Sequence, residues 1–230
     1  MKKILGVLVA GILLFSCCAV FAEGETATTP DLSGFDFSKL EEGITQGTIV
    51  LQDESSFAIA PTSDKVTVAG NMVSVQNGGV FMLLTLPDAY LCFTQDYNAS
   101  LQTYAMLNDQ SLREGLQNHM VQNDIHYYLL DMYTTNESAI LSIEPDQASM
   151  MIYNMKNLNS SDLNDIGAAF AQGGGVTYGG SYSSSTATWL KFTGKVNMYM
   201  TIVGGQYIVY QIGNASSADA EGILSALSIY

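Results

Sequence analysis

The sequence has few positively charged residues, and this scarcity excludes one large class of function. It contains 8 Lys and Arg residues against 22 Asp and Glu, a formal net charge of −14, and charged residues are 13% of the 230. Proteins that bind nucleic acid contact phosphates through clustered Lys and Arg. We therefore expect no nucleic-acid partner. The hydrophobic fraction of 47% excludes a disordered chain and suffices for the core of one domain.

Cysteine and histidine are also scarce, which removes the common metal and nucleophile motifs. No pair among Cys17, Cys18 and Cys92 has the spacing of metal ligands. The sequence contains no Gly-x-Ser-x-Gly and no His-Glu-x-x-His motif. From these patterns we predict no catalytic residue, no cofactor and no metal site.

The N-terminal segment has the pattern of a bacterial secretory signal. Met1-Lys2-Lys3 is positively charged, residues 4–22 carry no charge, and Val20-Phe21-Ala22 precedes the acidic residue Glu23. This pattern predicts a signal peptide over residues 1–22 that is removed after Ala22. Its removal takes away two lysines and no acid, so the mature chain is more acidic still.

Two alternatives to a cleaved signal stay open. Leu14-Phe15-Ser16 followed by Cys17 resembles a lipoprotein processing box, in which Cys17 is lipidated, although Phe15 is bulky for that position. The uncharged run is also just long enough to remain as a membrane anchor. Each alternative places the folded part outside the cytoplasm, either secreted or on the outer side of the membrane.

A flexible spacer is expected at residues 23–43, and a single domain at residues 44–230. Short apolar runs predict strands at 44–50, 57–60, 66–68, 72–75, 80–86, 90–94, 125–133, 138–143, 148–155, 176–182, 188–192, 196–203 and 206–212. Gly204-Gly205 predicts a two-residue hairpin turn. Helical spacing predicts helices from about Asn108 to Val121, from a cap at Ser160 or Ser161 to Gly173-Gly174-Gly175, and over 217–227. Meanders separated by isolated helices predict an α+β fold, an antiparallel β-sheet with helices packed on its faces.

Three segments resemble parts of a known group of proteins. Leu86 to Asp96 resembles the Pro-Gly-Trp-type strand of uncharacterised exported proteins of Gram-positive gut bacteria, with Ala89-Tyr90 in place of Gly-Trp. Asn197 to Ile208 resembles their penultimate hairpin, and the closing Leu227-Ser228-Ile229-Tyr230 is similar to the end of those chains. The resemblance covers about residues 80–230. It implies a PsbP-like α/β/α sandwich and an exported, non-catalytic accessory or binding module.

His119, His126 and Asp131 are the polar residues with the most unusual surroundings. His119 lies at the margin of a helical apolar stripe, and His126 opens the aromatic run 127–133, in which Asp131 is the only charge. The histidines could form a metal pair or act as acid and base, and Asp131 could have a raised pKa. We favour ordinary structural roles for all three, with Asp131 marking a strand that emerges into solvent.

Four other features have a structural explanation that we prefer to the functional one. Asp162 and Asp165 have part of a calcium-loop spacing but fit the first turn of a helix. Residues 173–180 are rich in glycine but lack the Lys of a phosphate loop, so they predict a helix C-cap. Cys92 fits a buried small hydrophobic residue better than a reactive thiol. The 13 tyrosines could form a binding face, but sheet packing explains most of them.

These observations together predict an exported, non-catalytic binding or accessory module at the bacterial cell envelope. Its partner would be a protein or another envelope component, and it would contact the membrane only through an N-terminal anchor or lipid. The alternatives are a secreted hydrolase whose site has no recognisable motif and a structural surface protein.

Overall fold

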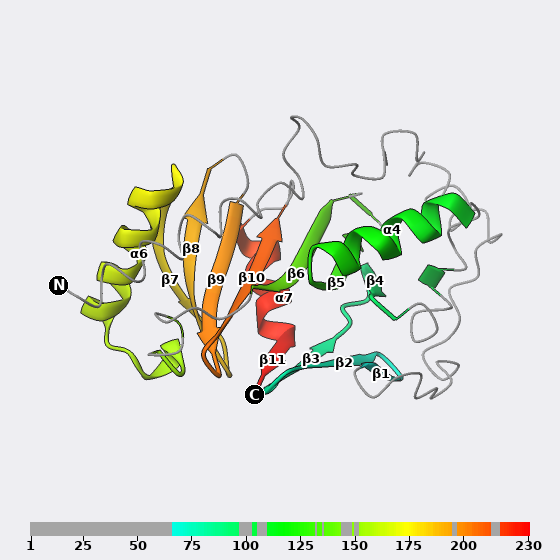
Figure 1. The fold of residues 1–230 in the computed structure, drawn as a ribbon, viewed down its shortest axis with the longest axis horizontal. Helices are drawn as coiled ribbons and strands as arrows, with labels where there is room; N and C mark the ends of the chain where they lie inside the picture. Colours follow the sequence, from blue (N-terminus) through cyan, green and yellow to red (C-terminus); the bar gives the residue numbers. More distant parts are fainter. Residues whose placement is uncertain are drawn as a thin grey trace.

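The computed structural model describes residues 66–96, 103–104, 110–131, 133–134, 136–143, 149, 152–194, 197–212 and 217–230. These residues form two antiparallel sheets of 4 and 7 strands, named sheet A and sheet B below (Figure 1). The predicted signal peptide, the spacer and the strands predicted at 44–50 and 57–60 lie outside the described residues. Within the described part, no helix is both long enough and apolar enough to cross a membrane.

Sheet A combines three strands linked by hairpins with one strand from the last residues of the sequence. Its order is β1-β2-β3-β11. The strands are β1 (Val66–Ala69), β2 (Met72–Asn77), β3 (Val80–Thr85) and β11 (Leu227–Ile229). Burial alternates along β2 and β3, with Val73, Val75, Met82 and Leu84 buried. Because side chains of a strand alternate between two faces, one face of sheet A is buried and the other is open.

Sheet B has the order β4-β5-β6-β10-β9-β8-β7. Its strands are β4 (Tyr90–Thr94), β5 (Ile125–Asp131), β6 (Glu137–Ile143), β7 (Thr177–Ser183), β8 (Thr188–Thr193), β9 (Asn197–Val203) and β10 (Gln206–Ile212). Strands β5, β6, β9 and β10 are buried along nearly their whole length, which explains why apolar residues occupy both faces of these strands. The predicted turn between β9 and β10 is confirmed, since Gly204 and Gly205 have φ of 59° and 77°.

The described helices are α4 (Gln110–Gln122), α6 (Ser160–Gly174), α7 (Ser217–Ala226) and the short 3-10 helix η4 (Met155–Asn157). The N-cap of α6 is Asn159, whose side chain accepts a hydrogen bond from the backbone N–H of Asp162. The predicted cap at Ser160 or Ser161 is therefore wrong by one or two residues, because Asn caps as well as Ser does. The predicted glycine C-cap is confirmed at Gly175, with φ of 65°.

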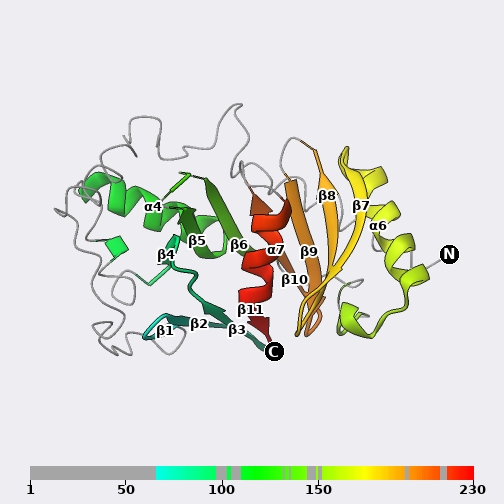
Figure 2. The same ribbon diagram turned by 180° about the vertical axis from the view of Figure 1, so that it is seen from behind.

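Sheet B is the middle layer of the domain, and its two faces have different covers. On one face, Met120 of α4 and Phe170 of α6 belong to one core cluster with Leu141 and Phe192 of the sheet. On the other face, sheet A and α7 enclose a second cluster that includes Tyr127 and Trp189. Figures 1 and 2 show this arrangement from opposite sides, with α7 and β11 behind sheet B in Figure 1.

The predicted fold class, an antiparallel sheet with helices packed on its faces, is wrong. The described residues form two sheets with 11 strands and only three α-helices, so the fold is dominated by sheets. Residues 66–85 build a second sheet, and α7 ends at Ala226 so that β11 can complete it. An alternating pattern indicates that one face of a strand is buried, but not which layer covers that face.

Two local predictions are also wrong. The strand predicted at 148–155 is absent from its described part, where Ser149 is helical, Asn154 makes one isolated bridge to Val203 and Met155 begins η4. The sequence pattern places Val121 beside the apolar stripe of α4, but this residue is 54% exposed. Leu116 and Met120 of that stripe are buried as expected.

Candidate functional site

The two histidines lie on different elements and have different partners. His119 of α4 is buried, its Nδ1 lies 3.2 Å from Nδ2 of Asn123, and burial lowers its pKa from the usual 6.5. His126 of β5 is buried and contacts residues of β2 and β6. In the described part of the chain, no three His, Cys, Asp or Glu side chains are grouped so that they could hold a metal ion.

Asp131 lies at the end of β5 and organises the turn that follows. It is half-buried, and the residues after it, Tyr133 and Thr134, are exposed. Its Oδ1 accepts the backbone N–H of Tyr133 at 2.8 Å, and its Oδ2 accepts the hydroxyl of Thr134 at 2.7 Å. The interpretation that Asp131 marks the point where the strand reaches solvent is confirmed.

The other sequence candidates have the structural roles that we preferred. Asp162 is in the first turn of α6, and Asp165 is exposed on the same helix. Cys92 is buried in β4, and burial raises the pKa of its thiol well above 9.0, so it is not a reactive thiolate. Cys17, the lipidation residue of one alternative, lies outside the described residues.

The most concentrated polar cluster is a triangle of Asn77, His126 and Ser142 between the two sheets. His126 is the extra residue of a β-bulge, because the pairing of β5 with β6 shifts between Ile125 and Tyr127. His126 Nε2 lies 2.7 Å from Ser142 Oγ. Nδ2 of Asn77 lies 2.7 Å from the same hydroxyl and 3.2 Å from the imidazole nitrogen.

Chemistry fixes the direction of one hydrogen bond in the triangle, and the direction of the other depends on the imidazole tautomer. The amide nitrogen of Asn77 can only donate, so Ser142 Oγ accepts from it. With the imidazole proton on Nδ1, Nε2 of His126 accepts and the hydroxyl of Ser142 donates to it; with the proton on Nε2, the direction is reversed. A serine that donates to a histidine is the first requirement for a serine nucleophile.

Two further facts favour a structural role for the triangle. Ser142 and His126 are only 4% and 5% exposed, so a substrate does not reach them in this conformation. The backbone N–H of Ser142 donates to the carbonyl of Asp124 at 3.2 Å and is not available to stabilise an oxyanion. The triangle instead links the end of β2 to β5 and β6. Sequence reasoning missed Asn77 and Ser142; the signal for Ser142 was a polar residue inside a buried apolar strand.

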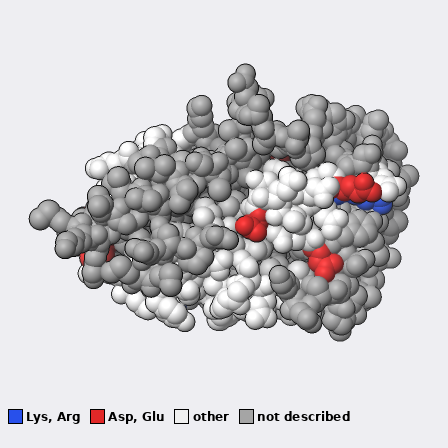
Figure 3. All heavy atoms as spheres, viewed as in Figure 1, with Lys and Arg blue, Asp and Glu red and all other residues white. Residues whose placement is uncertain are grey.

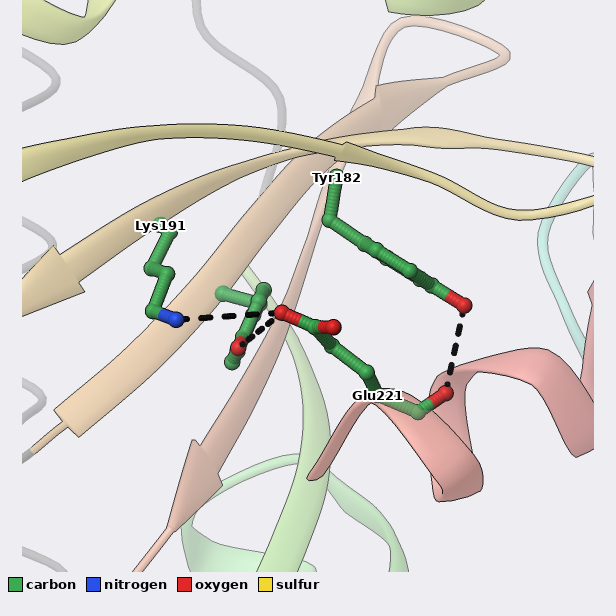
Figure 4. A network of polar contacts seen from close by, with 4 residues as sticks. Tyr182, Lys191 and Glu221 are labelled. Carbon is green, nitrogen blue, oxygen red and sulfur yellow. Dashed lines mark hydrogen bonds and ion pairs between the residues drawn. The ribbon is translucent and has the colours of Figure 1, made fainter. Parts of the chain in front are cut away.

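A second polar network fastens α7 to the strands of sheet B (Figure 4). The hydroxyl of Tyr182 lies 2.6 Å from Ser225 Oγ and donates to the carbonyl of Glu221 at 3.3 Å. The Glu221 carboxylate accepts from the hydroxyl of Tyr199 at 3.1 Å and lies 3.7 Å from Lys191 Nζ. Lys191 and Glu221 are partly exposed, so their ion pair contributes little to stability. The network joins β7, β8 and β9 to α7, which indicates a role in positioning α7.

The outer face of sheet A, the side that points away from sheet B, is the most unusual surface of the described chain. The four strands β1, β2, β3 and β11 contain no charged residue. Three large apolar side chains stand on this face: Met72 is 42% exposed, Phe81 is 38% exposed and Tyr230, just after β11, is 64% exposed. The side chains of this face are those of Thr67, Ala69, Met72, Ser74, Gln76, Phe81, Leu83, Thr85, Ser228 and Tyr230.

Other parts of the described surface differ from this face. In the view of Figure 3, acidic side chains are scattered singly among uncharged ones. Exposed large hydrophobic residues elsewhere in the described part, Val121, Tyr133 and Tyr153, lie on separate segments of the chain. The expectation that most tyrosines serve sheet packing is confirmed for Tyr127, Tyr128, Tyr199, Tyr207 and Tyr210, which are buried. The alternation that marks the outer face was readable in β2, where Val73 and Val75 separate Met72, Ser74 and Gln76.

Glu137, at the start of β6, has the most perturbed carboxylate among the described residues. Burial raises its pKa from the usual 4.5, and the nearby Tyr128 hydroxyl lowers it in part. The two groups do not reach ordinary hydrogen-bond geometry, so we attribute their interaction to electrostatics. In the pairing of β5 with β6, Leu130 lies opposite Glu137 and Tyr128 lies opposite Ala139, so Tyr128 and Glu137 are diagonal neighbours.

This raised pKa leads to a prediction about pH and stability. The folded protein holds the Glu137 proton more tightly than the unfolded chain, so the contribution of this group falls as pH rises through the window above 4.5. Glu137→Gln is uncharged throughout. Urea unfolding at about pH 4 and about pH 7 should show the variant gaining stability relative to wild type at the higher pH. A difference that is constant, or that favours wild type as pH rises, would contradict the burial of a charged carboxylate.

Comparison with known proteins adds no relative to this description. No protein-family model, curated protein or solved structure matches the chain. The resemblance to exported proteins of Gram-positive gut bacteria stays a prediction.

Proposed function

We propose that the protein is an exported, non-catalytic binding module of the bacterial cell envelope, and that it binds through the outer face of sheet A. The observation that carries this proposal is a sheet face without charged side chains, with three exposed large apolar side chains, in a strongly acidic protein. Apolar side chains gathered on one face of a soluble domain are typical of interaction sites. The export part of the proposal rests on the N-terminal pattern of residues 1–22.

The position of this face in the fold supports the proposal. The inner face of sheet A packs in the buried cluster that it shares with sheet B and α7. This packing fixes the backbone that carries the outer side chains. Its outer residues are small polar or apolar groups, which require little desolvation when a partner covers them. Exposed aromatic and methionine side chains are enriched at the centres of interfaces.

A sedimentation experiment tests the binding site. The mature chain, residues 23–230, is mixed with envelopes isolated from the native host and centrifuged. Phe81→Glu places a carboxylate in the proposed face, and Val121→Glu makes the same change at an exposed apolar residue of α4. We expect wild type and Val121→Glu to sediment with the envelopes and Phe81→Glu to remain in solution. Thermal unfolding checks that both variants are folded. Equal sedimentation of the two variants, or none for wild type, would refute the proposed site.

The compartment is tested separately by the intact mass of the protein from its native host. We expect a chain that begins at Glu23. A chain that begins at Cys17 and carries lipid would establish the lipoprotein alternative. A chain that still begins at Met1 would establish the uncleaved membrane anchor. Detection of the protein only in the cytoplasm would refute the export part of the proposal.

The contact between Ser142 and His126 favours one alternative function, a secreted hydrolase. A hydrolase of this type would form an acyl-enzyme at Ser142 Oγ while His126 takes the hydroxyl proton and passes it to the leaving group. The burial of both residues ranks this alternative second. Incubation with a fluorophosphonate probe, followed by mass spectrometry, distinguishes the two. We expect no adduct on Ser142, whereas an adduct that is lost in His126→Ala would favour the hydrolase.

A further inference from the structure

We propose that the ligand of the outer face of sheet A is an uncharged polysaccharide, which binds to the rings of Phe81 and Tyr230 and to the side-chain amide of Gln76. This inference rests on the proposed function and names the chemical class of its partner. Three observations lead to it: the fixed geometry of the aromatic pair, the neutral hydrogen-bonding groups beside the pair, and the charge of the whole protein.

The aromatic pair consists of Phe81 and Tyr230. Their ring centroids are 6.3 Å apart and their planes are inclined by 37°. The backbones of the two residues exchange hydrogen bonds, from Phe81 N to Tyr230 O at 2.9 Å and from Tyr230 N to Phe81 O at 2.8 Å. These bonds hold Tyr230 beside β3, so its exposed ring is kept next to Phe81 before any partner arrives. Preorganisation of this kind lowers the entropic cost of binding.

Neutral hydrogen-bonding groups surround this pair. Gln76 lies opposite Phe81 in the pairing of β2 with β3, so an exposed amide and two rings form one row across the sheet. The next row contains Ser74, Leu83 and Ser228 in register. A sugar ring has an apolar C–H face that packs on an aromatic ring, and hydroxyls at its edge that bond to amides and hydroxyls. The two rows present these two kinds of contact side by side.

Charge separates a neutral polysaccharide from the other envelope components. The protein has a formal charge of −14, and its outer face offers no Lys or Arg, so an anionic polymer would be repelled and would find no ion pair. A charged protein surface would lose its hydration against this face without an opposite charge in return. A neutral chain of sugars meets neither penalty.

The experiment uses material from the native host, so that the identity of the sugar need not be known. Envelopes are digested with protease, and their polysaccharides are separated by anion exchange into a neutral and an anionic fraction, each of which is immobilised. We expect the mature chain to be retained by the neutral fraction and not by the anionic one. Because no ion pair takes part, retention should be nearly the same at low and high salt.

Variants define the contribution of the aromatic pair. Phe81→Ala and Tyr230→Ala should each weaken retention by the neutral fraction about tenfold or more, since each removes a stacking surface. Tyr230→Phe keeps the ring and should retain most of the binding. Tyr133→Ala removes a tyrosine that is 74% exposed elsewhere on the surface and should bind like wild type.

The outcomes separate this inference from the proposed function. If wild type sediments with intact envelopes in a Phe81-dependent way but is retained by neither polysaccharide fraction, the binding face stands and the polysaccharide is refuted. Retention by the anionic fraction alone refutes it as well. If ultracentrifugation of the isolated chain shows a dimer that Phe81→Glu dissociates, the face is an interface between two copies. Failure of envelope binding itself refutes both proposals.

Discussion

Tyr127→Phe is expected to lower the free energy of unfolding by about 1–3 kcal/mol, although it removes a single oxygen atom. Tyr127 lies in β5 of sheet B and is fully buried. Its hydroxyl reaches across the core to sheet A and lies 3.0 Å from the carbonyl of Val73 and 2.9 Å from that of Met82, on neighbouring strands β2 and β3. The variant leaves both carbonyls without this donor in a site that water does not reach.

The neighbouring residue provides the control. Tyr128 is 4% exposed on the opposite face of β5, and its hydroxyl has no hydrogen-bond partner among the described residues. Tyr128→Phe removes the same atom from the same strand, and its hydroxyl interacts with the Glu137 carboxylate only electrostatically, so at about pH 4 it should lower the free energy of unfolding by less than Tyr127→Phe does. Urea unfolding of the three proteins measures both effects. If the two variants lose equal stability, the hydroxyl of Tyr127 does not join the sheets.

This bond has a consequence for the proposed binding site. Sheet A is attached to sheet B by the shared apolar cluster, the Asn77–His126–Ser142 triangle and the hydroxyl of Tyr127. The outer face, on the opposite side of sheet A, makes none of these contacts. Tyr127→Phe should therefore weaken stability while leaving envelope binding by the folded protein unchanged, whereas Phe81→Ala should do the reverse.

Gly167→Ala is expected to lower the free energy of unfolding by about 1–3 kcal/mol, opposite in sign to the usual effect of alanine in a helix. Gly167 lies within α6, where the ring of Tyr178 from β7 packs on its Cα. A Cβ at this position would stand 2.4 Å from Cε2 of Tyr178. The ring has little room to move, because it contacts Phe192 at a centroid distance of 5.8 Å and its hydroxyl donates to Asn164.

Gly222 provides the matched control in another helix. It lies in the middle of α7 and is exposed, and a methyl group added at its Cα would meet no other atom within 4 Å. Gly222→Ala should raise the free energy of unfolding by about 0.5–1 kcal/mol, because alanine restricts the unfolded chain more than glycine does. Thermal and urea unfolding of both variants give the two signs. Stabilisation by Gly167→Ala would mean that α6 and β7 do not pack as closely as described.

Much of the local structure could be predicted from the sequence, because it depends on neighbouring residues. Strand β10 has the predicted bounds Gln206–Ile212, and the glycine turn before it forms as expected. The helical stripe of Leu116 and Met120 identified the buried side of α4. The segment at Leu227–Ile229 was missed, since three residues are too few for a pattern and pair only because β3 is beside them.

The residues of the candidate site also fall into two groups: those that local patterns place on one face, and those that only the tertiary structure brings to it. Alternation along β2 places Met72 and Gln76 on one side, but Phe81 lies in the continuous apolar run 80–84, so its place beside Gln76 depends on the register of β2 with β3. That Tyr230 would join them could not be predicted, because it depends on the pairing of β11 with a strand about 145 positions earlier in the sequence. The same holds for Asn77, which meets His126 and Ser142 only because sheet A lies over sheet B.

Whether the chain forms one sheet covered by helices or two stacked sheets was likewise decided by the tertiary structure. The apolar side chains of β2 and β3 had to be buried, and the sequence shows this through Val73 and Val75 of β2 and the apolar run 80–84 of β3. A helix and a sheet satisfy that requirement equally, since hydrophobic burial is not directional. The specific contacts between layers, such as the hydroxyl of Tyr127 with two carbonyls of sheet A, decide between them. Such contacts join residues 45 and 54 positions apart, and no local pattern in the sequence encodes them.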